Sequence, residues 1–144
     1  MKKRVVPVAL LLLVCIFGAL PKVYAQVKVQ PFCKFTFIDH RGHSTKLHTN
    51  VMHASHTSIT FIFETGEKLI FKFTTIRAGH FFAESARSKD PQIIFYPAHS
   101  SHFHALVGAV VISSTKPTLA GNFNHLMSDD DKVHFNIVSG SFSF

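Results

Sequence analysis

Phenylalanine at alternate positions is the feature that most constrains how this chain can fold. The 144 residues hold 16 phenylalanines and no tryptophan. Successive side chains of a β-strand point to opposite faces, so large apolar residues two positions apart indicate strands with one buried face. No window shows the i, i+3, i+4, i+7 spacing of an amphipathic helix. The chain is therefore expected to be all-β, and the alternating pairs are Phe35/Phe37, Phe61/Phe63, Phe71/Phe73 and Phe142/Phe144.

The first 25 residues have the organisation of an export signal that is removed. Basic residues at 2–4 precede an apolar run at 5–20, and residues 23–25 read Val-Tyr-Ala, a small–x–small cleavage pattern. The alternative is a membrane anchor, but the apolar run is shorter than the roughly 20 residues that a spanning helix needs. We expect cleavage after Ala25, a single domain over residues 26–144, no transmembrane segment in the mature chain, and a periplasmic or extracellular location.

Removal of the leader changes the charge and the cysteine content. Four of the 15 basic residues leave and all eight acidic residues stay, so the net charge falls from +7 to 11 − 8 = +3. The remaining chain has no dense Lys/Arg cluster, which argues against a nucleic-acid partner. Cys15 leaves as well, and Cys33 then has no partner for an internal disulfide. Its apolar neighbours indicate a buried thiol, and the alternative is a reactive or intermolecular thiol.

Gly, Pro and Asp divide the mature chain into about nine short apolar runs. Such runs between turn residues are typical of antiparallel strands. About nine strands in about 119 residues (144 − 25) predict a β-sandwich or a flattened barrel with essentially no helix. Residues 50–56 are polar and are expected to be irregular. The expected strands are 34–39, 44–49, 58–64, 68–74, 79–84, 92–96, 106–112, 119–123 and 133–137, and the chain finishes with the run 139–144, in which 139–141 is expected to be a turn at a strand junction.

Parity arguments predict the register of two hairpins, because residues directly opposite each other share a face. For strands 58–64 and 68–74, a three-residue loop at 65–67 places Glu64 near Lys68 and gathers six apolar side chains on one face. Burial of about 1.5–3 kcal/mol per side chain outweighs the usual preference for two-residue turns. For the last hairpin, pairing Phe123 with Phe135 requires an odd-length connection centred near Asp129. The six side chains are Ile59, Phe61, Phe63, Leu69, Phe71 and Phe73.

The strand expected at 106–112 is apolar on both faces, which predicts the most buried, central strand of the sheet. Gly108 lies inside this run. A glycine within a strand indicates a bulge or the close approach of another backbone.

Histidine is the residue type most able to carry chemistry, with 11 in the chain. His102 and His104 lie two positions apart, so both would point to one face of a strand, and His99 could reach them from the preceding loop. Neutral imidazole binds Zn, Cu and Ni, so a three-histidine site is one hypothesis. The alternative is that these histidines are solvated or cap loops, since no HExxH signature is present. No other cofactor is expected.

A binding module is the favoured function and an enzyme is not expected. The chain has no Gly-x-Ser-x-Gly nucleophile motif and no convincing carboxylate pair, so no catalytic residues are predicted. Exported β-sandwiches commonly recognise partners through loops and sheet faces. Phe82, Tyr96 and Phe103 could form an exposed patch for a protein or glycan partner; alternatively they pack in the core.

The C-terminal segment carries three strand-like motifs: G-x-V-x-I at 108–112, G-x-F at 121–123 and I-x-x-G-x-F at 137–142. In these it resembles the ending of a broad group of Bacteroidetes exported proteins and lipoproteins with no assigned function. The resemblance implies an all-β fold and export to the cell envelope, and it supplies no catalytic residues. The chain departs from the lipoproteins because Cys15 lies in the middle of the apolar run.

Overall fold

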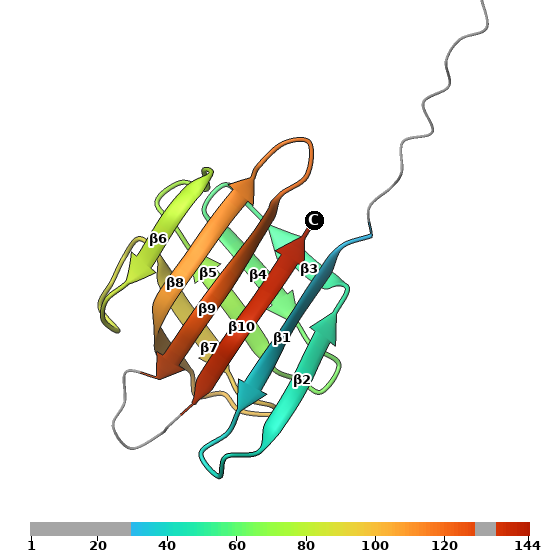
Figure 1. Ribbon diagram of the computed structural model, residues 1–144, viewed down its shortest axis with the longest axis vertical. Coiled ribbons are helices and arrows are strands. Elements are labelled where there is room, and N and C mark those ends of the chain that lie inside the picture. Colours follow the sequence, from blue (N-terminus) through green and yellow to red (C-terminus); the bar gives the residue numbers. More distant parts are fainter. Residues whose placement is uncertain (1–29, 129–134) are drawn as a thin grey trace, which may run out of the picture.

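The computed structural model describes residues 30–128 and 135–144, and these residues form ten antiparallel strands and no helix (Figure 1). This confirms the all-β prediction. Accordingly, the described part of the chain holds no helix long and apolar enough to cross a membrane. The strands are β1 Phe32–Ile38, β2 Ser44–Thr49, β3 Val51–Ala54, β4 Ser58–Ile62, β5 Lys68–Lys72, β6 Gly79–Ala83, β7 Gln92–Tyr96, β8 His104–Ser114, β9 Ala120–Ser128 and β10 Asn136–Ser143.

The strands form one sheet that folds back on itself into a nearly closed, barrel-like shape. The order is β2-β1-β10-β9-β8-β7-β5-β4-β3, and β6 pairs with β8 beside this path. Figure 1 shows β6, β8, β9, β10, β1 and β2 in a front layer, with β7, β5, β4 and β3 behind them. The long strand β8 joins the layers, because its first part pairs with β7 and its second part with β6. A sandwich or flattened barrel was expected, and this architecture confirms it.

One segment that was expected to be irregular is a strand. Residues 51–54 form β3, which pairs with β4 at the edge of the back layer. The segment escaped prediction because Met52 alone is buried in it, so no alternation is visible. Thr49 makes the transition from β2: its buried hydroxyl donates to the Ile62 carbonyl and accepts from the Val51 N–H at 2.9 Å.

The odd-length loop between β4 and β5 is confirmed. The Phe63 N–H donates to the Glu67 carbonyl at 3.0 Å, which leaves a three-residue loop at 64–66, and the six predicted apolar side chains are all buried. The loop lies one position earlier than expected, so Lys68 faces Ile62 and not Glu64. Gly66 explains the shift, because its φ of +97° suits the left-handed last position of such a loop.

The register predicted for the last hairpin is wrong. Phe123 lies opposite Gly140, and the Ser128 N–H donates to the Phe135 carbonyl, which leaves an even-length connection at 129–134. Asp129, the expected centre of the turn, is outside the described residues. The reason is steric: a Cβ at position 140 would lie 2.2 Å from Phe123 Cζ, so the phenylalanine ring occupies the space that the glycine leaves free.

Strand β8 is central but is not buried on both faces as predicted. Its inward side chains Leu106, Val110 and Ile112 are buried, whereas the outward side chains beside them are partly exposed, because the second layer covers only the inner face. The prediction for Gly108 is confirmed. The register shifts between Val107 and Ala109, and a Cβ on Gly108 would lie 2.6 Å from the His125 carbonyl oxygen.

Phenylalanine rings fill the space between the two layers. Phe71 and Phe61 of the back layer contact Phe123 and Phe142 of the front layer, with ring centroids 5.2 Å and 5.3 Å apart. These four rings are at most 2% exposed, and most neighbouring rings meet at steep angles, as aromatic pairs prefer. The alternating phenylalanines are therefore part of the core of the barrel, except for partly buried Phe37 and exposed Phe144.

Candidate functional site

Two rows of outward-facing side chains run across the strands of the front layer. Directly paired residues share a face, so the row can be followed from strand to strand through the register. We call these two rows, together with the inward-facing row between them, the transverse track. The first row is His48, Lys34, Ser141, Asn122, Val111 and His80; the second is Lys46, Thr36, Ser139, Asn124, Ala109 and Phe82; the inward row is Leu47, Phe35, Gly140, Phe123, Val110 and Phe81. In the second row the register between β1 and β10 shifts at Thr36, and Thr36 and Ser139 are placed together because both line the same hollow.

The track is hollowed where it crosses β2, β1 and β10. The hollow measures about 570 Å³, and both outward rows of these three strands line it. Phe35, Leu47 and Gly140 contribute to its floor. Gly140 has no side chain, and its partner on β9, Phe123, is fully buried. No side chain therefore fills the hollow at this point. A second hollow of about 530 Å³ adjoins the first, because Lys34 and His48 line both; Asn50 also lines the second hollow.

Positive charge gathers at the β2 and β1 end of the track. Lys34, Lys46 and His48 are all exposed, and the Lys34 Nζ lies 5.9 Å from the centroid of the Phe32 ring. No side chain of the track is acidic, and the carboxylates among the described residues all lie in turns and loops. This face therefore offers cations and hydrogen-bond donors without competing carboxylates. The loop and turn carboxylates are Asp39, Glu64, Glu67, Glu84 and Asp90.

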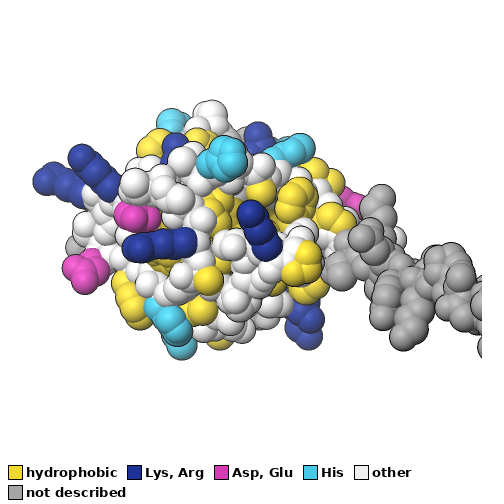
Figure 2. Space-filling model, turned by 90° about the horizontal axis from the view of Figure 1, so that it is seen from above, with side chains coloured by type: hydrophobic (Ala, Val, Ile, Leu, Met, Phe, Trp, Pro, Cys, Tyr) yellow, Lys and Arg dark blue, Asp and Glu magenta, His cyan; other side chains and the backbone are white. Residues whose placement is uncertain are grey.

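A third hollow of about 250 Å³ lies at one end of the barrel, between the loops around Ser55, Thr75 and Thr115. Figure 2 looks onto this end and shows apolar side chains exposed among polar ones. Its lining holds one charged side chain, Lys116, and one histidine, His56. This hollow is smaller than the one on the track and concentrates fewer ionic groups, so the track is the stronger candidate.

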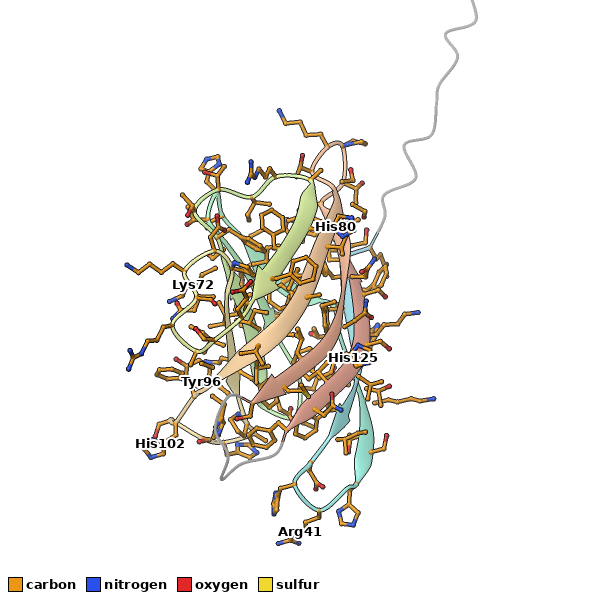
Figure 3. The ribbon with its side chains drawn as sticks, turned by 60° about the vertical axis from the view of Figure 1, so that its left-hand side comes forward. Arg41, Lys72, His80, Tyr96, His102 and His125 are labelled. Atoms are coloured by element: carbon orange, nitrogen blue, oxygen red, sulfur yellow. The ribbon has the colours of Figure 1, made fainter. Side chains whose placement is uncertain are left out.

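The structure places the three histidines of the predicted metal site in different surroundings. His99 has a φ of +56° in the loop before β8, near Gly66. His102 is exposed and points away from the barrel (Figure 3). His104 packs edge-on against Phe135, with ring centroids 4.6 Å apart. Among the residues that the structure describes, no group of three His, Cys, Asp or Glu could hold a metal ion, so the geometry gives this hypothesis no support.

The three aromatic residues proposed as one patch lie in two places. Phe103 is 56% exposed, and its ring centroid lies 5.8 Å from that of half-buried Tyr96. Phe82 is 61% exposed on β6, opposite Ala109, and so belongs to the transverse track. The structure thus pairs two of them and assigns the third to another surface.

Two further groups that could carry chemistry have structural explanations. Cys33 is fully buried, as expected, and burial raises the pKa of its thiol, so it is not a reactive thiolate. Asp39 lies at the β1–β2 turn, where its carboxylate accepts the backbone N–H groups of His43 at 2.9 Å and Arg41 at 2.8 Å. These bonds, His43 first, hold the pKa of Asp39 below its ordinary value. The carboxylate therefore stabilises a turn at the tip of an exposed hairpin; Figure 3 shows Arg41 there, away from the track.

Most residues of the track were not singled out from the sequence, although a signal was present. Polar residues occur two positions apart at 34/36, 46/48, 122/124 and 139/141. Each pair indicates one polar strand face, but strand order was needed to place the four pairs side by side. No protein-family model matches the chain, and neither a curated protein nor a solved structure matches it.

Proposed function

We propose that the protein is an exported, non-catalytic binding module of the cell envelope or the extracellular space, and that it engages its partner through the transverse track. The observation that carries the proposal is the packed interior. A barrel that holds a ligand inside needs an empty lumen, whereas here phenylalanine rings from both layers meet across the centre. Recognition then takes place on the outer surface.

The track has the properties of a recognition surface. It lies on paired strands of a rigid sheet, so its side chains keep their relative positions without a partner. It is hollowed at one end and displays an exposed aromatic ring, Phe82, at the other. The resemblance of the C-terminal motifs to those of exported envelope proteins supports the same cellular setting.

A track-blocking variant tests the proposal. Ser139→Trp/Ser141→Trp places two large rings over the hollow, whereas Lys72→Trp on β5 puts one on the outer face of the back layer and serves as the control. Both variants and the wild type are screened by biolayer interferometry against extracellular proteins and polysaccharides. We expect partners of the wild type to be lost by the track-blocked variant and kept by the control. Undiminished binding by the blocked variant, turnover of a partner, or no partner in the whole panel would contradict the proposal.

A further inference from the structure

We propose that the transverse track binds a linear, acidic polysaccharide that lies across the strands, with its acidic groups at the β1 and β2 end and a sugar ring against Phe82. The inference rests on the proposed function and names the ligand class of the same surface. Its support comes from the dimensions of the track and from the order of chemical groups along it.

The dimensions fit a single extended chain. The track crosses six strands in the spatial order β2, β1, β10, β9, β8 and β6. Neighbouring strands lie about 4.8 Å apart, so the track is roughly 24 Å long. The two outward rows are two residues apart along each strand, which corresponds to about 7 Å. An α-helix with its side chains is about 10–12 Å across, so a helical peptide is too wide to lie between the rows.

The order of groups fits a saccharide that carries negative charge. Lys34 and Lys46 stand on neighbouring strands and can each approach a carboxylate or a sulfate. In the middle, Asn122 and Asn124 are exposed, and their amides both donate and accept hydrogen bonds, as sugar hydroxyls require. At the far end, the exposed ring of Phe82 offers a flat apolar face to the C–H groups of a sugar ring.

Two other polyanions fit the track less well. An anionic membrane would favour exposed apolar side chains gathered around the cations, but the residues next to Lys34 and Lys46 on the track are Thr36, His48 and Ser141. Single-stranded nucleic acid would favour several aromatic residues on which successive bases stack, and Phe82 is the one phenylalanine in the outward rows. Both therefore serve as competing probes.

The decisive experiment compares polygalacturonate, a linear polymer of acidic sugars, with its methyl ester, which has the same backbone without the charge. Binding to the purified protein is measured at low salt by affinity electrophoresis and by isothermal titration. We expect polygalacturonate to bind about tenfold more tightly than the ester. Lys34→Gln/Lys46→Gln should weaken its binding about tenfold, a size typical of two exposed ion pairs. The matched control, Lys68→Gln/Lys72→Gln on β5, removes the same charge from the back layer and should change binding less than about twofold.

A third variant addresses the aromatic end of the track. Phe82→Ala should weaken binding of both polymers roughly fivefold, since it removes an apolar contact that does not depend on charge. The side chain is exposed, so the variant is expected to fold normally, and circular dichroism checks the folding of all variants.

The outcomes separate this inference from the proposed function. Equal binding of the acid and the ester, abolished by Ser139→Trp/Ser141→Trp, would overturn the acidic ligand and leave the binding module in place. Binding that survives the two tryptophans would overturn both. If Lys34→Gln/Lys46→Gln and Lys68→Gln/Lys72→Gln weaken binding equally, the polymer is attracted by the net charge of the protein and not by the track, and the inference is overturned. Tighter binding to phosphatidylglycerol vesicles or to poly(dT) than to polygalacturonate would also overturn it.

Discussion

Replacing Gly140 with alanine should destabilise the protein, although alanine is normally the better residue in a strand. A Cβ at this position would lie 2.2 Å from Phe123 Cζ and 2.8 Å from the Phe35 Cβ. The Phe123 ring has no room to withdraw, since it is fully buried and packs against Phe71 and Phe142 at centroid distances of 5.2 Å and 6.4 Å. The substitution therefore overfills a packed core.

The expected magnitude follows from two opposing effects. Forcing additional atoms into a well-packed core costs about 1–3 kcal/mol. Alanine has less conformational freedom than glycine in the unfolded chain, and this difference stabilises the folded alanine variant by about 0.5–1 kcal/mol. The 2.2 Å contact is far shorter than any real Cβ contact, so the steric cost should lie in the upper half of its range. The net loss of unfolding free energy for Gly140→Ala should then be about 1–2.5 kcal/mol, or roughly 4–10 °C in Tm for a domain of this size.

Urea denaturation followed by circular dichroism measures this loss. Ser139→Ala, at the exposed neighbouring position, serves as the control and should change stability by less than about 0.5 kcal/mol. In a Phe123→Leu background, which shortens the obstructing side chain, Gly140→Ala should cost less than in the wild type. A Gly140→Ala variant as stable as the wild type, or more stable, would show that the ring yields and that the steric argument is wrong.

Three further predictions concern single positions. Gly108→Ala should lower the unfolding free energy by more than about 1 kcal/mol in urea denaturation, because φ is +145° and the new Cβ would meet the His125 carbonyl oxygen at 2.6 Å; an unchanged midpoint would refute this. Cys33 should resist alkylation in the folded protein and react on unfolding, because burial removes access and raises the thiol pKa; rapid iodoacetamide labelling without denaturant would contradict the buried position. Asp39 should titrate below the pKa of an aspartate in an unfolded chain, because His43 and Arg41 donate to its carboxylate. Since the folded pKa is the lower one, this stabilisation is complete above the unfolded-chain pKa and is lost as the pH falls through the folded pKa. Carbon-13 NMR of the carboxyl group measures it, and an Asp39 pKa at or above the unfolded-chain value would contradict the turn geometry.

The two hairpins show how far sequence reasoning reaches. Between β4 and β5 the strands are joined by a short loop, so parity and the burial of six apolar side chains sufficed to predict the shared face. Between β9 and β10 the same reasoning failed, because it paired Phe123 with another phenylalanine. In the folded protein the ring needs the empty space at Gly140, and this steric requirement does not appear as periodicity.

The candidate site likewise was predictable only in part from the sequence. Polar residues at alternate positions marked the outward faces of single strands, and Phe82 was recognised as a possible exposed aromatic. The number of histidines favoured a metal site in the sequence, yet the described structure places His99, His102 and His104 in different surroundings. Residue type alone did not show whether these histidines lie together, and strand pairing was needed to place the polar residues of the track side by side.

Local alternation by itself determined that the chain is all-β and which side chains of a strand point inward, because side-chain direction along a strand has a period of two. The tertiary structure alone decided which strands are neighbours. β1 pairs with β10 from the opposite end of the chain, and this contact brings Lys34 beside Ser141. Such long-range pairing depends on how phenylalanine rings and glycines fit together across the barrel, and that fit exists only once both layers are in place.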